Sequence, residues 1–564
     1  MVLRNITLAV MAGGALVPAI AHADHHRHVN HVVLLSIDGL HQADLDWYVA
    51  MHDDSTLARL VRGGANYTNA RTPFPSDSFP GLVGQVTGGN PKSTGIYYDD
   101  AYSRSLLFPP YPAKMPDCKQ PPGAEVQYAE NVDIDQTSID AGQGLALGTY
   151  SYDDIEDNIY GLSSRASDLI DPRNLPWDPT SCMPVYPHQY LEVNTIFEVA
   201  HDHGLHTAWS DKHAAYDIVS GPSGSGVDEF FTPEINSNAA SDSPNSGDWT
   251  KDNLDTQFYD ALKVEAVLRW AQGKHHDGTS NPTGVPAIYG MNFQAVSTAQ
   301  KLNMSRYGDL KPAGTAPGLG GYSAGGTIPD EVLQGALQFV DDQMQKIVAA
   351  VGDDTVVILS AKHGQSPQDR ADLTIISDGD MITALETAWS KAGHKGPLVA
   401  HAIDDDGVLM WLTDRSGADF AADFLRSYSG TGVGSDSKGN ATKKPFTNAG
   451  LKKIYAGEQA ADFIGVKHSD DRVPDLIGIA QQGSVYDKTT LSKIAEHGGN
   501  AAQDRHVPIV VWGAGIEHEW IDDKVETTQI APTILKLLGL PRHELEAVEL
   551  EGTKVLPDLE RDGK

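Results

Sequence analysis

The apolar residues of this chain fall into short continuous runs that predict buried strands. Uninterrupted apolar runs are typical of parallel strands that are covered on both faces. Another strand is expected to begin at Thr207. The runs with strand character are Val32–Ile37, Ala287–Tyr289, Val356–Leu359, Asp475–Ala480 and Val507–Trp512.

Between the strands, apolar residues recur every three or four positions. This spacing predicts one helix over about Asp330–Val351 and another over Pro187–His203. Strands separated by helices indicate βαβ units, so we expect an α/β fold with a mainly parallel central sheet flanked by helices.

Two regions interrupt the alternation, at about 101–186 and 365–465. We interpret them as insertions that cap the carboxyl edge of the sheet, where specificity elements usually lie. A third irregular segment, Gly221–Trp249, is expected to be a loop. The predicted organisation is one domain over residues 24–564 with these insertions.

Residues 1–23 have the pattern of a secretory signal peptide. Arg4 gives a basic start, Ile6–Ile20 an apolar core and Ala21–Ala23 a small-residue cleavage site. No later segment offers roughly 18 uninterrupted apolar residues, so we predict an exported protein, periplasmic or secreted, with no membrane span. Export would also permit a disulfide between Cys118 and Cys182, although two free thiols are the alternative.

The net charge restricts the partners. The chain has 76 acidic and 42 basic residues, a formal charge of −34. Such a field repels nucleic acid polymers and anionic lipid surfaces, but not a small phosphorylated substrate that is bound in a local site. The alternative explanation of the charge is solubility, or adaptation to a salty or acidic medium, and the charge does not predict the oligomeric state.

Two polar residues stand where an α/β protein places chemistry. Asp38 ends the first predicted strand, and ligands bind at the carboxyl ends of such strands. Ser78 precedes Leu82–Val86, the expected start of a helix, whose N–H groups attract anions. The alternative is structural: Asp38 caps a turn and Ser78 caps a helix.

Several segments resemble a known family in the same order. These are Asp38-Gly39, Ser78-Phe79-Pro80, Thr87-Gly88, Gly95-Ile96, DRVPDLIGIA from Asp471, AEHGG from Ala495, VPIVVWGAG from Val507 and TTQIAPTILKLLGLP from Thr527. They are similar to type I phosphodiesterases and nucleotide pyrophosphatases of the alkaline phosphatase superfamily. The resemblance implies an alkaline-phosphatase-like fold and hydrolysis of phosphodiester or pyrophosphate bonds by a serine nucleophile.

The resemblance also implies a divalent metal cofactor, expected to be zinc. It puts Asp38, Ser78 and His363 around one ion beside the nucleophile, and His497 at a second ion. It further implies a phosphate contact at Asp99, where the family has an asparagine. From their place at a predicted strand end, the amides of Asn292 and Gln294 are additional candidates for substrate contacts.

Three positions depart from the family's metal ligands. Lys362 stands where the family has an aspartate, and a protonated ammonium cannot ligate a metal. Gln294 and Thr298 replace an aspartate and a histidine.

The departures leave three hypotheses open. In the first, a single ion remains and Lys362 acts catalytically as the second positive charge, similar to the basic side chains of sulfatases in the superfamily. In the second, the metal site is rebuilt from Asp211 and His213. In the third, catalysis is lost. The candidate functions are therefore a phosphodiesterase, a phosphatase, phosphonate hydrolase or sulfatase-like esterase, and a non-catalytic binding protein.

Overall fold

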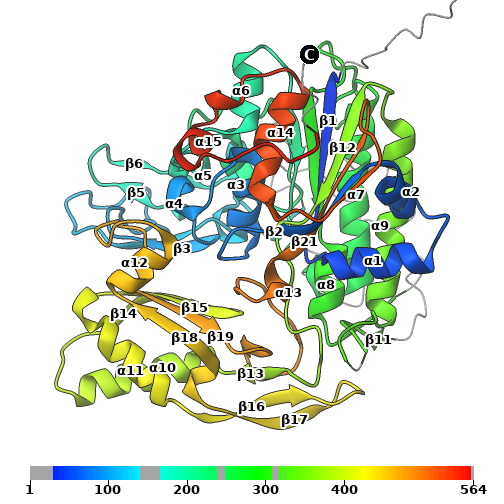
Figure 1. Cartoon of the computed structure of the whole chain (residues 1–564). Helices are drawn as coiled ribbons and strands as arrows, with labels where there is room; N and C mark the ends of the chain where they lie inside the picture. Colours follow the sequence, from blue (N-terminus) through cyan, green and yellow to red (C-terminus); the bar gives the residue numbers. More distant parts are fainter. Residues whose placement is uncertain (1–28, 140–164, 238–247, 308–316, 324, 560–564) are drawn as a thin grey trace, which may run out of the picture.

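The computed structural model describes residues 29–139, 165–237, 248–307, 317–323 and 325–559. The predicted signal peptide lies outside these residues. A nine-stranded sheet runs through the larger part of the molecule, with helices on both faces (Figure 1). The fold is α/β with a mainly parallel central sheet, as the sequence predicted.

The middle of the central sheet is parallel. β1 (His31–Ile37) lies between β12 (Thr355–Ser360) and β9 (Ile288–Phe293), and the sheet continues through β7 (Ala208–Ser210). The four strands run in one direction, so their carboxyl ends meet at one edge. The other strands are β8 (Glu229–Phe231) beyond β7, and β21 (His506–Gly513), β2 (Ala65–Arg71), β22 (Glu519–Ile521) and β23 (Val525–Glu526) beyond β12, with β21 antiparallel to both β12 and β2.

Helices pack on both faces because each presents an apolar side to the buried strands. One layer holds α1 (Gln42–Met51), α2 (Thr56–Gly63), α7 (Asn253–Ala271), α8 (Ala295–Lys301) and α9 (Glu331–Ala350). The other holds α3 (Ser78–Thr87), α6 (Ile196–Asp202), α14 (Ile530–Leu537) and α15 (Glu546–Glu551). The helix predicted over about Asp330–Val351 is confirmed by α9.

The single helix predicted over Pro187–His203 is wrong. The chain forms α5 (Pro187–Tyr190), then an extended stretch, then α6. Thr195 adopts extended backbone angles, and its hydroxyl accepts a hydrogen bond from the Glu198 N–H. A threonine in this position starts a new helix, which explains the break.

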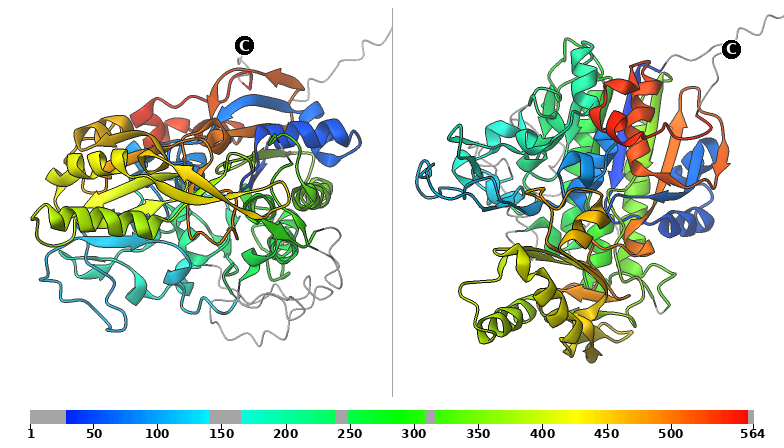
Figure 2. Two further views of the ribbon diagram at one scale, coloured as in Figure 1. Left: turned by 90° about the horizontal axis from the view of Figure 1, so that it is seen from below. Right: turned by 60° about the vertical axis from the view of Figure 1, so that its left-hand side comes forward.

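Two smaller sheets lie beside the central sheet, at the lower left of Figure 1. The strand predicted at Asp475–Ala480 is β19 (Leu476–Ala480). It belongs to one of these smaller sheets and not to the central sheet, since its two neighbours are β15 and β18, and both run antiparallel to it. The second view of Figure 2 shows this part to one side of the main body. Its elements are β13 (Thr374–Ile376), α10 (Asp378–Lys391), β14 (Val399–Asp404), β15 (Gly407–Leu412), α11 (Ala418–Ser427), β16 (Gly430–Ser435), β17 (Ala441–Phe446), β18 (Leu451–Ala456), α12 (Glu458–Ile464), β19 and β20 (Ser484–Tyr486).

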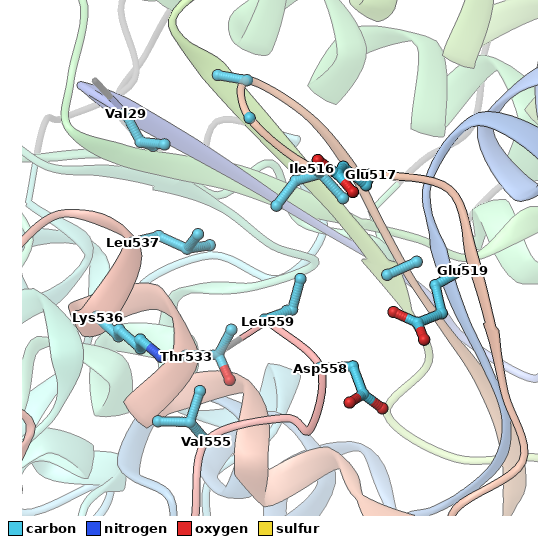
Figure 3. A pocket seen from close by; sticks show the side chains of 13 residues that line it. Val29, Ile516, Glu517, Glu519, Thr533, Lys536, Leu537, Val555, Asp558 and Leu559 are labelled. Carbon is cyan, nitrogen blue, oxygen red and sulfur yellow. The ribbon is translucent and has the colours of Figure 1, made fainter. Parts of the chain in front are cut away.

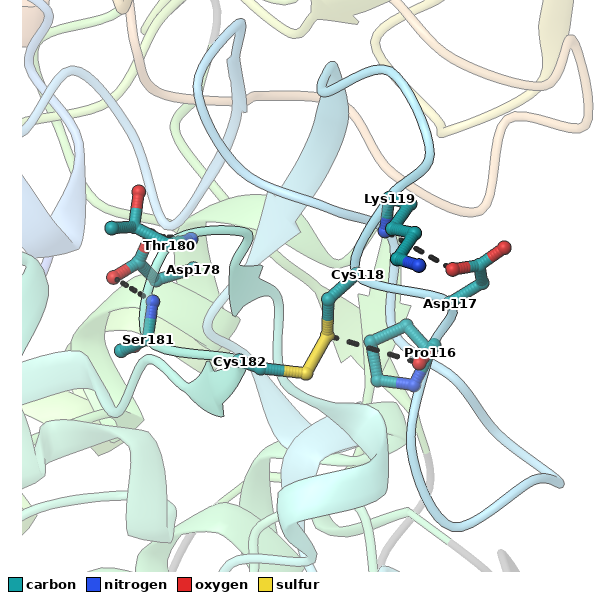
Figure 4. The surroundings of a disulfide bond; sticks show 8 residues. All are labelled: Pro116, Asp117, Cys118, Lys119, Asp178, Thr180, Ser181 and Cys182. Carbon is teal, nitrogen blue, oxygen red and sulfur yellow. Dashed lines mark hydrogen bonds between the residues drawn. A yellow bond between two sulfur atoms is a disulfide. The ribbon is translucent and has the colours of Figure 1, made fainter.

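The region from about residue 101 contains short hairpins and a disulfide. The hairpins are β3 (Asp100–Ser103) with β4 (Ala124–Gln127), and β5 (Trp177–Asp178) with β6 (Met183–Pro184). Cys118 and Cys182 are joined, with their Cα atoms 5.8 Å apart (Figure 4), which confirms the predicted pairing. Among the described residues no helix is both long and apolar enough to cross a bilayer.

The segment Gly221–Trp249, predicted as a loop, contains the edge strand β8, which pairs with β7. Its first residue, Glu229, accepts hydrogen bonds from the His276 backbone N–H at 2.7 Å and lies 2.6 Å from the His276 Nδ1 and 2.7 Å from the His275 Nδ1. Burial alone would raise the pKa of Glu229, but the His276 contacts outweigh it and lower the pKa to about 2.

This depressed pKa predicts acid sensitivity. Because the folded carboxyl has the lower pKa, Glu229 stabilises the fold above its unfolded pKa, and the stabilisation is lost as the pH falls from about 4.5 to about 2. The shift corresponds to roughly 3 kcal/mol. Unfolding followed across this range should show a smaller pH dependence in Glu229→Gln than in the wild type, whereas the exposed Glu549→Gln control keeps the wild-type slope. Equal slopes in all three proteins would disprove the assignment.

Candidate active site

The candidate residues gather at the carboxyl ends of the four parallel strands. Asp38 follows β1, and Lys362 and His363 follow β12. Asn292 and Gln294 lie at the end of β9, and Asp211 follows β7. Ser78 faces them from the first position of α3.

Ser78 begins α3 because Asp77 caps the helix, its carboxylate accepting from the Phe79 N–H at 3.0 Å. The helix thus starts four residues before the predicted Leu82. The Ser78 hydroxyl lies 3.5 Å from Asp38 Oδ2 and 3.2 Å from His363 Nε2. Ser78 is only 2% exposed, so solvent does not saturate its hydroxyl.

Asp38 is buried and held by several donors. Its Oδ2 accepts from Gln294 Nε2 at 2.5 Å and from Asn292 Nδ2 at 3.2 Å. Burial would raise the pKa of Asp38, but the charges of Lys362 and Lys212 and the hydrogen bond from Gln294 keep it below its usual value. The amides of Asn292 and Gln294, predicted to contact substrate, are therefore directed at an ionised Asp38.

Lys362 lies between two carboxylates. Its Nζ is 3.1 and 3.2 Å from the two oxygens of Asp211, 3.8 Å from Asp38 Oδ2 and 4.2 Å from the centre of the Tyr216 ring. Asp211 Oδ2 also accepts from Trp209 Nε1 at 3.1 Å. Both oxygens of Asp211 are thus engaged by donors, which disfavours the hypothesis that it replaces a metal ligand.

Two other predicted positions are filled by packing. The His213 ring lies 4.9 Å from that of Tyr216 and 6.4 Å from that of Phe79, and burial lowers the pKa of His213 well below its usual value. Thr298 Oγ1 accepts from Asn253 Nδ2 at 2.8 Å. Within the described residues, neither His213 nor Thr298 forms a hydrogen bond with Asp38 or Ser78.

The two histidines of the site lie together. The ring centres of His363 and His497 are 4.2 Å apart. Burial lowers the pKa of His363 to about 3 and that of His497 well below its usual value, so both imidazoles are neutral. His497 Nδ1 lies 3.5 Å from the Tyr98 hydroxyl, which donates to Asp405 after β14, so the smaller sheets border the site.

The surroundings of Asp99 favour its neutral form. Burial, and then the neighbouring Asp77, raise the pKa of Asp99 well above its usual value. A neutral carboxyl does not repel phosphate, so the repulsion expected from an aspartate at this position is removed.

The sequence analysis missed Lys212. Its Nζ donates to the Ser78 hydroxyl at 3.3 Å. The signal was available, since Lys212 stands between Asp211 and His213 directly after a predicted strand, but only metal-ligating side chains were considered there. Asp77, Tyr98 and Lys263 were also missed; Lys263 donates to Asn292 Oδ1 at 3.0 Å and so orients that amide.

The donor set around Ser78 does not fit the metal that the resemblance implies. A hard or borderline cation needs anionic or imidazole ligands, and Asp38 is the one carboxylate facing Ser78 within hydrogen-bonding distance among the described residues. An ion bound by Asp38, Ser78 and His363 would lie beside the ammonium groups of Lys212 and Lys362. Like charges at such distances repel strongly in a buried site.

Two groups of acidic residues and histidine within the described residues have donor atoms close enough for a cation. They are Asp405 with Glu496 and His497, and Asp100 with Glu125 and His401. In the first group, each Glu496 oxygen already forms an ion pair at 2.7 Å, one with Lys301 and one with Lys493.

A cavity of about 360 Å³ lies away from these residues. Figure 3 shows Val29, Lys536 and Asp558 among the side chains that line it. Val29 precedes β1, so the cavity is at the amino end of the strand whose carboxyl end carries Asp38.

The sequence comparison finds a family similarity in the first part of the chain. Residues 32–217 match the model of the type I phosphodiesterase / nucleotide pyrophosphatase family. The resemblance is confirmed there. This segment contains Asp38, Ser78, Asp99 and Lys212, and the match supports a hydrolase of the phosphodiesterase or pyrophosphatase type, a family that is typically dependent on divalent metals. No curated protein sequence matches the chain.

The alkaline-phosphatase-like fold that the sequence predicted is confirmed by one solved structure. The alkaline phosphatase PafA has a TM-score of 0.54 and 14% identity, over 91% of this chain and 96% of that one. Murine ectonucleotide pyrophosphatase / phosphodiesterase 5 has a TM-score of 0.49 and 12% identity over the same shares, both by itself and as an inactive form in complex with AMP.

Proposed function

We propose that the protein hydrolyses a phosphodiester or pyrophosphate bond of a small substrate, with Ser78 as the nucleophile. The observation that carries the proposal is the Ser78 hydroxyl, 3.2 Å from a neutral His363 Nε2 and 3.3 Å from Lys212 Nζ. A serine hydroxyl needs a neighbouring base or positive charge to attack near neutral pH. Lys212 supplies the positive charge, and His363 Nε2, a weak base in this buried site, lies within reach of the hydroxyl proton.

In the first step, Ser78 Oγ forms a bond to phosphorus while the bond to the leaving group breaks. The hydroxyl proton passes to His363 Nε2, which the geometry puts within hydrogen-bonding distance. His363 then gives this proton to the oxygen of the leaving group. In the second step, a water oxygen bonds to phosphorus while the bond from phosphorus to Ser78 Oγ breaks, and a proton from that water passes through His363 Nε2 to Ser78 Oγ. Asp38 orients the Ser78 hydroxyl, and Lys362 balances the negative charge of Asp38. Most of the rate enhancement then comes from the positioning of the reacting groups and from stabilisation of the charge that develops on phosphorus-bound oxygens.

Zinc was predicted at Asp38, Ser78, His363 and His497, and the donor set around Ser78 does not fit it; of these residues, His497 also lies with Asp405 and Glu496 in a group whose donor atoms are close enough for a cation. No step of the reaction is assigned to zinc. Export stays a prediction; the Cys118–Cys182 disulfide supports it, because such bonds form in oxidising compartments.

The test is a panel of nitrophenyl esters. We expect turnover of the phosphodiester to exceed turnover of the phosphomonoester and the sulfate ester. Preference for either of the other esters would favour a phosphatase or a sulfatase-like esterase. No turnover of any ester, with phosphate still bound, would favour a binding protein that retained the fold.

A further inference from the structure

Lys212 presents a positive charge to the site without an anionic partner in the described structure. Its Nζ is hydrogen-bonded to the Ser78 hydroxyl, and no described carboxylate oxygen lies within ion-pair distance of it. The side chain of Lys212 is partly buried, and its Nζ points at the nucleophile. A half-buried ammonium without a counterion is suited to an anionic ligand.

Lys362 has a different role, because its charge is already compensated. It forms its ion pair with Asp211 and lies near Asp38, and its side chain is completely buried. Lys362 therefore neutralises the two carboxylates in the interior of the site. It is a positioning residue, and its charge is not available to a ligand in the way that the charge of Lys212 is.

The start of α3 is no substitute for Lys212. Helix starts often bind anions through free N–H groups. Here the Asp77 carboxylate accepts from the Phe79 N–H, so this donor is taken by the protein itself. The arrangement leaves Lys212 as the cation that faces the nucleophile.

We propose that Lys212 binds a non-bridging oxygen of a tetrahedral oxyanion next to Ser78, and that this binding needs no metal ion. The ligand class is a phosphoryl or sulfuryl group. An ammonium provides charge-assisted hydrogen bonds to such oxygens as a fixed point charge. The inference shares the Ser78 site with the proposed function and rests on it for the reaction, but oxyanion binding is measurable without turnover.

The experiment is calorimetric titration of the full chain with inorganic phosphate, and separately with sulfate, after chelator treatment and elemental analysis. We expect metal-free wild type to bind phosphate as tightly as untreated protein. Lys212→Met should weaken binding about tenfold or more, as for the loss of a hydrogen bond between charged groups. Lys212→Arg, which keeps the cation, should retain most of the affinity.

A matched control is Lys251→Met, at an exposed lysine outside the site, which should bind phosphate as wild type does. Phosphate binding that appears only after zinc or magnesium is added would overturn the inference, as would unchanged affinity in Lys212→Met. If Lys212→Met does not fold, the comparison of metal-free and metal-loaded wild type decides alone. Stronger binding of sulfate than phosphate would assign the site to sulfuryl groups.

The titration also separates this inference from the proposed function. Ser78→Ala retains Lys212, so it should still bind phosphate while it hydrolyses nothing. If Ser78→Ala keeps full hydrolysis but metal-free protein binds phosphate through Lys212, the nucleophile is wrong and the oxyanion site stands. If Ser78→Ala loses hydrolysis but phosphate binding requires metal, Ser78 is the nucleophile and the metal-independent oxyanion site is refuted.

Discussion

Replacement of Ser78 by alanine is expected to lower kcat/KM for a nitrophenyl phosphodiester by about 1000-fold or more. The variant removes the oxygen that forms the covalent intermediate, and nothing else in the described site offers a hydroxyl between His363 Nε2 and Lys212 Nζ. The fold should be unaffected, because Asp77 and not Ser78 caps α3. Steady-state kinetics and circular dichroism of both proteins measure the two effects.

The matched control is Ser55→Ala. Ser55 also stands at the start of a helix, where its hydroxyl accepts from the Ala58 N–H, but it lies outside the site. We expect this variant to lose about 1 kcal/mol of stability and no activity. Full activity in Ser78→Ala, or an equal loss in Ser55→Ala, would refute the assignment of the nucleophile.

Replacement of Lys362 by methionine is expected to destabilise the fold by about 3–5 kcal/mol, the usual cost when one member of a buried ion pair is removed. The variant leaves Asp38 and Asp211 buried without the cation between them. Urea-induced unfolding of the wild type and the variant measures the difference. The loss of stability should shrink as the pH falls, because a buried carboxyl without its cation has a raised pKa and takes up a proton in the folded state.

Two further variants make this prediction specific. Lys346→Met removes an exposed lysine of α9 and should leave stability nearly unchanged. Adding Asp211→Asn to Lys362→Met removes one of the uncompensated carboxylates and should restore part of the loss. A double variant no more stable than Lys362→Met would show that the pair does not act through charge.

The sequence was sufficient to predict the centre of the fold, and several of the predicted site residues lie together around Ser78. The continuous apolar run of β1 identifies a buried parallel strand, and Asp38 at its end then belongs to the functional edge of the sheet. The Pro- and Ser-rich stretch around Ser78 indicated a helix start nearby, but the prediction put that start at Leu82 and did not include Asp77, the residue that caps α3.

Other features depend on contacts that no local pattern contains. β19 has the composition of a central strand, and only its pairing with β15 and β18 puts it in a smaller sheet. The role of Lys212 follows from its distance to Ser78, which is 134 positions away in the chain. The Asp211–Lys362 pair likewise joins segments 151 positions apart.

The most direct test of the central claim is to quench a single turnover of the wild type with acid and to locate the phosphoryl group by peptide mass spectrometry. We predict a phosphorylated peptide that contains Ser78 and carries the modification on that residue. Phosphorylation of a different residue, or product formation with no phosphorylated intermediate at any time of the turnover, would contradict the account.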